Sequence, residues 1–102
     1  MSRSKYNIKL LRIAEDDLAE IISYISADRP SAAEALATKI ENDLDLLAEN
    51  PHSGRVPEEE DLVRLHYRYL VVENYLIFYV IEGQTMYVHR ILHGARDYLS
   101  LF

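Results

Sequence analysis

With 102 residues, 49% of them hydrophobic and only three Gly and three Pro, the chain is long enough for one small globular domain and too apolar for disorder. The absence of Cys excludes disulfides and thiolate metal sites, and because no long apolar run occurs we expect neither a signal peptide nor a membrane span, but a cytoplasmic protein. The net charge of −6 is uneven: residues 13–61 carry fourteen acidic and three basic side chains, which excludes a uniformly basic nucleic-acid binder.

The N-terminal part of the sequence predicts a strand followed by a helix. Residues 6–12, YNIKLLR, partly alternate and are rich in strand-forming residues, which favours a strand. Apolar side chains then recur with helical spacing at Leu18, Ile21, Ile22 and Ile25. We expect Glu15, Asp16 and Asp17 in the first turn of this helix, where carboxylates complement the helix dipole.

A second helix is predicted after a short break. Residues 28–30, DRP, interrupt the first helix, and Pro30 suits the first turn of the next one. Helical spacing then continues at Ala33, Leu36, Ala37, Ile40, Leu44 and Leu47. Asn50 and Pro51 end this helix, because the residue before a proline is pushed out of the α region. The two helices should form a hairpin whose acidic outer faces are solvated.

Beyond the hairpin the sequence predicts a loop and three strands. Residues 51–61, PHSGRVPEEED, contain two Pro, one Gly and four consecutive acids, which indicates a loop. Residues 63–69 alternate between apolar and basic or imidazole side chains and predict strand two. Residues 75–81, YLIFYVI, are continuously apolar, as expected of a central strand covered on both faces. A hairpin turn at 82–85 then leads to strand four at 86–92.

These elements predict an α+β fold in a single domain that spans residues 1–102. The order is β-α-α-β-β-β: an N-terminal strand, a helical hairpin and a three-stranded antiparallel meander, followed after Gly94 by a short helical or extended C-terminal tail. The hairpin should cover one face of the sheet and leave at least part of the other face open.

Standard enzyme signatures are absent from the sequence. It has no Gly-rich phosphate loop before a helix, no His-x-x-x-His pair on a helix and no nucleophile elbow. His89 and His93 are four residues apart, but on a strand this spacing separates them by about 13 Å along the chain, too far for a shared metal. We therefore expect no metal site and no cofactor.

The remaining chemical candidates are Arg, His and Tyr side chains on the predicted sheet. On strand two, three side chains would share one face: Arg64, His66 and Arg68. On strand four, alternation would separate two faces: Arg90 with Val88 and Leu92, and His89 with His93. Metal-free RNA cleavage needs a base, cations for the phosphorane charge and an acid, which these residue types can supply. They can equally line an exposed strand face without a chemical role.

Arg90 leaves two interpretations open. A charged side chain between Val88 and Leu92 lies either at the sheet edge or in an ion pair, and Asp97 is a plausible partner. Arg90 is then either a structural residue or a functional one, and the neighbouring Arg96 and Asp97 could equally cap the tail.

Several features are shared with one known family. They are the element order, Asn50, Pro51 and Gly54 after the second helix, and the stretch YLIFYVIEGQTMYVHRILHGARDY. Through them, over roughly residues 6–99, the chain resembles the RelE/ParE superfamily of type II toxins. The most specific part is RILHGARD, residues 90–97, which is close to the ParE-type ending.

The resemblance implies a growth-inhibiting toxin that a cognate antitoxin neutralises by wrapping a tail around it. In such systems the antitoxin supplies the part that binds promoter DNA, so we expect no direct contact between the toxin and its promoter. RelE-like members cleave mRNA in the ribosomal A site, whereas ParE-like members poison DNA gyrase. The first kind is an endoribonuclease and the second performs no chemistry itself.

Two departures from the RelE-like pattern favour the ParE-like branch. RelE-like nucleases usually have Tyr-Arg in strand three, with that Arg in the catalytic face, and here Tyr75 is followed by Leu76. The loop before strand two carries EEED at 58–61, the wrong sign for an approach to ribosomal RNA. We therefore predict a gyrase poison, with a ribosome-dependent mRNA endonuclease as the alternative. In that alternative the catalytic residues would be Arg64, Arg90, His93 and Tyr98.

For the antitoxin we expect two binding surfaces. One is the groove between the helical hairpin and the sheet. The other is the basic and histidine face, because an acidic antitoxin tail would complement its charge. The partner-binding residues of this second surface would be Arg64, His66, Arg68, Arg90 and Arg96.

Overall fold

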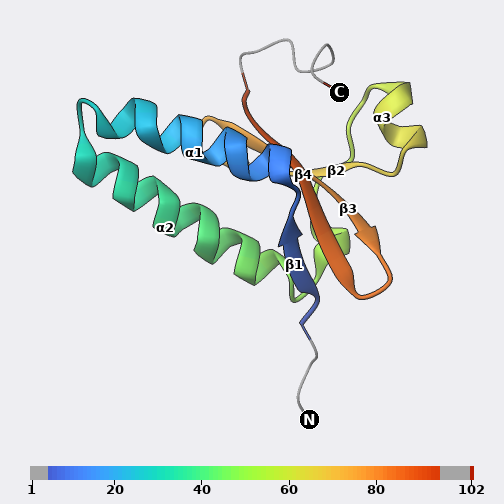
Figure 1. Ribbon diagram of the computed structural model, residues 1–102. Coiled ribbons are helices and arrows are strands. Elements are labelled where there is room, and N and C mark those ends of the chain that lie inside the picture. The colour runs from blue at the N-terminus through green and yellow to red at the C-terminus, as the bar shows by residue number, and fades with distance from the viewer. Residues whose placement is uncertain (1–4, 95–101) are drawn as a thin grey trace.

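Figure 1 shows the chain as a computed structural model, which describes residues 5–94 and 102. The elements are β1 (Asn7–Leu10), α1 (Arg12–Ser26), α2 (Pro30–Leu47), a 3₁₀ turn (Pro51–Ser53), α3 (Glu60–Arg64), β2 (Arg68–Val72), β3 (Tyr75–Glu82) and β4 (Thr85–His93). The predicted α+β order of a strand, a helical hairpin and three strands is confirmed. The tail predicted at 95–101 lies outside the described residues. In the described part, no helix is both long and apolar enough to cross a membrane.

The four strands in the described ranges form one sheet in the order β1-β4-β3-β2. The last three form the predicted antiparallel meander, and β1 joins β4 in parallel, with Leu10 opposite Val88. Gly83, in the turn between β3 and β4, has φ +59°, which glycine adopts without strain. Because β1 has only four residues, it pairs with the first part of β4 and ends at Leu10.

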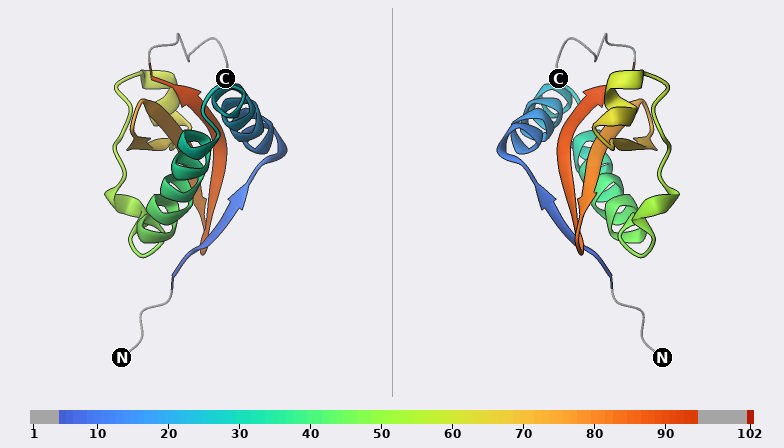
Figure 2. Two further views of the ribbon diagram at one scale, coloured as in Figure 1. Left: turned by 90° about the vertical axis from the view of Figure 1, so that its left-hand side faces the viewer. Right: turned by 90° about the vertical axis from the view of Figure 1, so that its right-hand side faces the viewer.

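The helical hairpin covers one face of the sheet, as the two views of Figure 2 show. Side chains of both layers meet in the main core, among them Ile40 and Leu44 from α2 and Ile77 and Tyr79 from β3. All four are at most 5% exposed, and burial of apolar surface at roughly 25 cal/mol per Å² is the main force that holds the layers together. This confirms the predicted placement of the hairpin.

The prediction of a strand over residues 63–69 is wrong. The chain instead forms the short helix α3 and enters β2 only at Arg68. The reason is Leu62, which is 2% exposed and packs with Phe78 and Leu92 on the sheet face opposite the hairpin. This contact is non-local, and the alternation of apolar and polar residues along the segment does not reveal it. Helix α3 therefore covers part of the face that was expected to be open.

Helix α3 ends in a Schellman motif that turns the chain toward β2. The N–H of His66 donates to the carbonyl of Val63 at 3.0 Å, and the N–H of Tyr67 donates to the carbonyl of Leu62 at 3.0 Å. His66 has φ 65°, in the left-handed region that glycine usually occupies at this position. Tyr67 packs against Leu62, which is the apolar contact that accompanies this motif.

A β-bulge in β4 corrects the predicted faces of strand four. Tyr79 lies opposite Val88, but the preceding residue of β3 lies opposite Arg90, so His89 is an additional residue in β4. As a result, Val88 packs in the hairpin-side core whereas Leu92 packs on the opposite face. The prediction that both share a face with Arg90 assumed uninterrupted alternation, and one added residue reverses it.

Candidate functional site

An apolar groove of about 390 Å³ lies between β1 and α2. Its lining residues, which define the β1–α2 groove, are Ile8, Leu10, Leu18, Ala37, Ile40, Glu41, Leu44 and Asp45. The walls are aliphatic and two carboxylates, Glu41 and Asp45, are the charged members of the lining. Lys5 Nζ lies 3.1 Å from Asp45 Oδ2 at the edge. Such a groove fits a segment with an apolar face and basic flanks.

A second hollow of about 350 Å³ lies beside α3. Its lining residues, which define the Arg68 recess, are His52, Val56, Val63, His66, Tyr67, Arg68 and Ile81. The recess is built from three parts of the chain: the 3₁₀ turn and the loop after it, the end of α3, and the sheet. It combines one guanidinium and two imidazoles with apolar walls.

Arg68 is half-buried at the start of β2, and its guanidinium is held in place by backbone carbonyls. Nη1 donates to the oxygen of His52 at 3.0 Å and to that of Gly54 at 3.1 Å. Within the described parts of the chain, no carboxylate lies within ion-pair distance of Arg68. The carbonyls orient the guanidinium but leave its charge uncompensated, which is the chemistry of an anion site.

The loop beside the recess is fixed by Tyr79. This side chain is 0% exposed and its hydroxyl donates to the carbonyl of Pro51 at 2.5 Å. Burial raises the pKa of Tyr79 to about 12, against the lowering effect of the nearby Arg68 charge. A Cβ at position 54 would lie 1.8 Å from the Tyr79 hydroxyl oxygen, so Gly54 is required by this close approach.

Tyr67, which packs against the cluster on the face opposite the hairpin, forms a polar contact with His89. The Tyr67 hydroxyl and His89 Nδ1 are 2.8 Å apart, and the two rings meet edge to face. Burial lowers the pKa of His89, with the charge of Glu82 acting in the opposite direction, and burial raises the pKa of Tyr67. At neutral pH the imidazole is therefore uncharged and the phenol protonated, so the Tyr67 hydroxyl can donate to His89.

Arg90 is paired with Asp17 of α1. Its Nε lies 2.8 Å from Asp17 Oδ2 and its Nη2 lies 2.9 Å from Asp17 Oδ1, and the two side chains are 13% and 14% exposed. Oδ2 also accepts the backbone N–H of Ile91 at 3.0 Å. The hydrogen bonds to Asp17 raise the pKa of Arg90 above its already high usual value. Asp17 thus fastens α1 to β4 beyond the end of β1.

Of the other predicted site residues, His93 lines one hollow together with Asp17, whereas Arg64 lies on a different element. Arg64 lies on α3, 72% exposed, with Nη1 3.7 Å from Asp61 Oδ1. His93 ends β4 with its ring 5.4 Å from that of Tyr75, measured between centroids. Arg96, Asp97 and Tyr98 lie outside the described residues, so their predicted roles are untested.

The structure thus groups the predicted residues differently from the sequence pattern. The expectation that Arg64, His66 and Arg68 share a strand face is wrong: the first lies on α3, the second in the turn after it, and the third on β2. His66 and Arg68 nevertheless line one recess, while Arg90 is engaged with Asp17. Among the residues that the structure describes, no group of three or more His, Asp or Glu could hold a metal ion.

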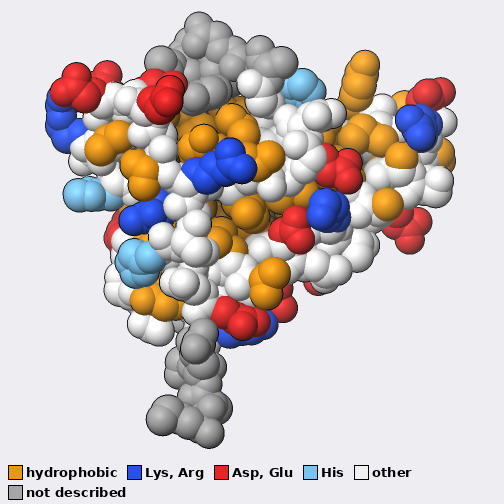
Figure 3. Space-filling model, turned by 180° about the vertical axis from the view of Figure 1, so that it is seen from behind, with side chains coloured by type: hydrophobic (Ala, Val, Ile, Leu, Met, Phe, Trp, Pro, Cys, Tyr) orange, Lys and Arg blue, Asp and Glu red, His pale blue; other side chains and the backbone are white. Residues whose placement is uncertain are grey.

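Acidic side chains border the recess. Residues 58–61 form the segment between Val56 and Val63, both of which line the recess, and three of these four acids are exposed. Seen from behind, the molecule has histidine, cationic and acidic side chains side by side on the flank that carries α3 (Figure 3). The small positive recess is therefore next to a negative surface, which disfavours an extended polyanion.

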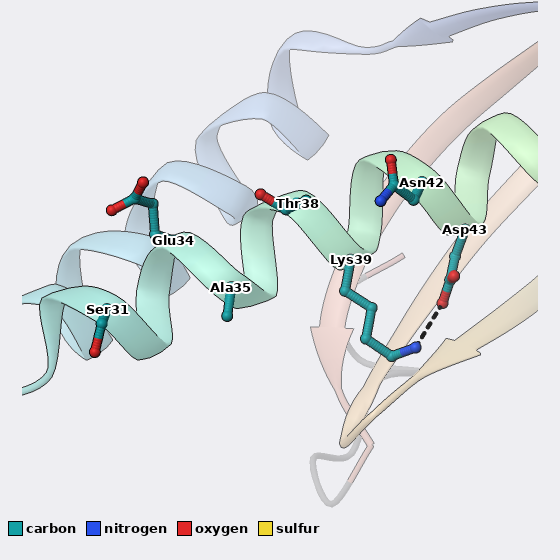
Figure 4. A pocket seen from close by; sticks show the side chains of 7 residues that line it. All are labelled: Ser31, Glu34, Ala35, Thr38, Lys39, Asn42 and Asp43. Atoms are coloured by element: carbon teal, nitrogen blue, oxygen red, sulfur yellow. Dashed lines mark ion pairs between the residues drawn. The ribbon is translucent and has the colours of Figure 1, made fainter.

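A further hollow runs along the outer face of α2, but it lacks the features of a binding site. Figure 4 shows its lining residues: Ser31, Glu34, Ala35, Thr38, Lys39, Asn42 and Asp43. All come from one helix, and Lys39 Nζ pairs with Asp43 Oδ2 of the next turn at 3.3 Å. It has the character of a solvated helix face, as predicted for this side of the hairpin.

Sequence reasoning missed two participants of these sites. Asp17 was expected in the first turn of its helix, but α1 begins at Arg12, so Asp17 lies in the second turn and faces β4. Tyr67 lies within the segment predicted as strand two, and its contact with His89 spans 22 residues of sequence. The available signal for Asp17 was its position as an acidic residue next to the apolar residues of the helix. This signal does not identify Arg90 as its partner.

The sequence matches a known family over most of its length. Residues 8–98 match the family described as "ParE toxin of type II toxin-antitoxin system, parDE". None of the curated protein sequences compared with this chain is significantly similar to it.

Solved structures with the same fold come from toxin-antitoxin systems. The chromosomal ParDE system from P. aeruginosa contains a chain with a TM-score of 0.73 and 20% identity, covering 87% of this chain and 96% of that one. The toxin-antitoxin complex RelBE2 from Mycobacterium tuberculosis contains another, with a TM-score of 0.62 and 19% identity, covering 88% of this chain and 99% of that one. At these identities the likeness shows the fold alone.

Proposed function

Because the chain belongs to the ParE family of toxins of type II toxin-antitoxin systems, we propose that it inhibits growth by poisoning DNA gyrase and that a cognate antitoxin neutralises it. The observation that carries the proposal is the match to the ParE family over residues 8–98. In this role the protein performs no chemistry. It stabilises the cleaved-DNA intermediate of gyrase through surface contacts, for which the C-terminal segment is a candidate.

Two features of the chain support a gyrase target over the ribosome. Leu76 follows Tyr75 and packs against the buried Leu62, Phe78 and Leu92, so this position of β3 contributes to packing and supplies no cation. The acidic segment at 58–61 borders the recess and opposes the approach of ribosomal RNA.

We assign the antitoxin to the two surfaces described above. The β1–α2 groove takes the apolar face of an antitoxin helix, because its walls are aliphatic and partly exposed. The second surface comprises His66 and Arg68 in the recess with the exposed Arg64 at its border. Arg90 contributes less directly, because its guanidinium is bound to Asp17. Arg96 remains part of this proposal without structural support.

The gyrase proposal is tested with purified protein, DNA gyrase and supercoiled plasmid. We expect linear plasmid to accumulate after detergent and protease treatment, and to increase with the concentration of the protein. A known gyrase poison serves as the positive control. No cleaved DNA at any concentration, while the control poison works, would contradict the proposal.

A second candidate function is a ribosome-dependent mRNA endonuclease, and the Tyr67–His89 contact favours it. The uncharged imidazole can accept a proton through Tyr67, and Arg68 lines the same recess as Tyr67. A base and a cation are two of the three requirements of metal-free RNA cleavage. The residues of this candidate differ from the catalytic set predicted from the sequence, which is Arg64, Arg90, His93 and Tyr98. Of that set, Tyr98 lies outside the described residues.

The nuclease candidate is tested by primer extension on transcripts from induced cells. Cleavage would appear as breaks at codon-defined positions, and Tyr67→Phe would abolish them while leaving the protein folded. Growth arrest with intact transcripts would exclude this function and leave the gyrase proposal in place.

A further inference from the structure

The two least exposed arginines that the structure describes, Arg90 and Arg68, have different kinds of hydrogen-bond partner. Arg90 makes a two-pronged ion pair with Asp17, and both side chains are less than 15% exposed. Arg68 is half-buried too, but it is bonded to two backbone carbonyls and no described carboxylate lies within ion-pair distance. Removing a guanidinium from water without a counter-charge costs free energy, so the charge of Arg68 is available for an anion from outside.

The surroundings of Arg68 are those of a small anion site. The carbonyls of His52 and Gly54 engage Nη1 alone, so the other nitrogens of the guanidinium can still donate. The side chains of His52 and His66 line the same recess, and His66 is held there in the left-handed backbone conformation that glycine usually takes. The Schellman motif at the end of α3 fixes this conformation and thereby places the imidazole at the recess.

The shape and polarity of the recess limit the anion. Val56, Val63 and Ile81 give it apolar walls, and its volume of about 350 Å³ is that of a side chain, not of an extended strand of nucleic acid. The exposed acids between Val56 and Val63 repel a polyanion but leave room for one carboxylate with an apolar neighbour.

We propose that the Arg68 recess captures a single carboxylate side chain, Glu or Asp, that lies among apolar residues of a partner protein, which is the antitoxin. The carboxylate pairs with the free nitrogens of Arg68, and apolar residues beside it in the partner contact Val56 and Val63. This inference rests on the proposed antitoxin partner, but the recess itself can be tested without that partner.

The direct test titrates the purified chain with propionate, which has the chemistry of a glutamate side chain. We expect the Nε–H resonance of Arg68 to shift saturably in nuclear magnetic resonance spectra, with the exposed Arg12 as the internal reference. In the variant Val63→Glu the new carboxylate occupies the recess, and the shift is lost. A shift at Arg68 no larger than that at Arg12 would overturn the inference.

A second experiment measures how tightly the protein encoded beside this gene binds matched variants of the chain. Arg68→Gln and Val63→Glu should each weaken binding at least about tenfold, because the partner carboxylate loses its cation or meets a like charge. Val63→Gln introduces a side chain of the same size as that in Val63→Glu but without its charge, and Arg12→Gln removes an exposed charge elsewhere. Both variants should bind the partner with wild-type affinity. Circular dichroism and urea unfolding identify variants that fail to fold, and only folded variants count.

The outcomes separate this inference from the proposed function. A neighbour-encoded protein that binds tightly and ignores both folded variants overturns the recess inference and leaves the toxin-antitoxin proposal standing. If the chain binds no such protein, the antitoxin is excluded as the partner. The propionate titration then tests by itself whether the recess binds a carboxylate. A single-stranded oligonucleotide that binds the wild type and is released by Arg68→Gln would assign the recess to nucleic acid and overturn the peptide carboxylate.

Discussion

At the scale of single residues, the buried Asp17–Arg90 pair joins segments 73 residues apart in the sequence. Two guanidinium contacts and the N–H of Ile91 converge on one carboxylate. A pair of this kind contributes little net stability relative to apolar residues, but loss of one partner leaves a charge that is nearly buried and unpaired.

Asp17→Asn should therefore lower the free energy of unfolding by about 2 kcal/mol, because Arg90 loses its counter-charge while the shape of the site is kept. Asp16→Asn is the matched control, since Asp16 is 67% exposed and its contact with Arg12 is long at 3.4 Å. Urea unfolding monitored by circular dichroism measures both. A loss for Asp17→Asn no larger than that of the control would contradict the assigned role.

Tyr79 predicts a specific pH dependence of stability. Its pKa is raised from 10.0 to about 12 in the folded protein, so its contribution is fully present below pH 10. Between pH 10 and 12 the unfolded chain loses this proton and the folded chain retains it, so the free energy of unfolding falls as pH rises, by up to about 2–3 kcal/mol. The difference between wild type and Tyr79→Phe in urea unfolding at pH 8 and pH 11 isolates this effect, and an unchanged difference would refute it.

At the scale of elements, the sequence predicts the helical hairpin and the central strand, whereas it does not predict the short helix α3. The helical spacing from Leu18 onward identified α1 and α2, and the apolar run YLIFYVI identified β3. Helix α3 was mistaken for a strand because its five residues are too few to show a period, and burial of Leu62 decides its conformation. The bulge at His89 reversed the faces of β4, and no local pattern reports an additional residue in one strand.

The end of α3 gives a test of this account at the element scale. His66 has a positive φ, where a β-branched residue is strained and glycine is not. We expect His66→Gly to keep or raise stability by up to about 1 kcal/mol and His66→Val to lower it by about 1–2 kcal/mol. Thermal unfolding of the two variants beside wild type measures the order. Equal stability of Gly and Val at this position would show that the Schellman motif does not form.

At the scale of the whole molecule, the candidate site was only partly predictable. The groove between hairpin and sheet follows from the element order alone. The Arg68 recess required the 3₁₀ turn, α3 and β2 to meet, and the sequence pattern predicted a loop and a strand where α3 forms. The pairing of Arg90 with Asp17 was missed for the same reason that most long-range contacts are missed, since no local signal connects the two residues.

The β1–α2 groove predicts a separation of toxicity from neutralisation. Ala37→Arg fills the groove and should abolish protection by the antitoxin while toxicity persists, because the groove lies apart from the recess beside α3. Ala35→Arg makes the same change on the outer face of α2, where Figure 4 shows it, and should leave protection intact. Colony counts after co-induction of toxin and antitoxin measure both variants. If the antitoxin fully protects cells against the Ala37→Arg variant, the groove is excluded as an antitoxin-binding surface.

An induction assay in living cells decides whether the protein is a toxin that acts on gyrase. The chain is expressed from a tight promoter, with and without the neighbouring antitoxin gene, in cells that carry an SOS reporter and are pulse-labelled for translation. We expect growth to stop with strong SOS induction while protein synthesis continues, and co-expression of the antitoxin to restore growth. Unimpaired growth, or arrest with an immediate halt of translation and no SOS response, would contradict the claim.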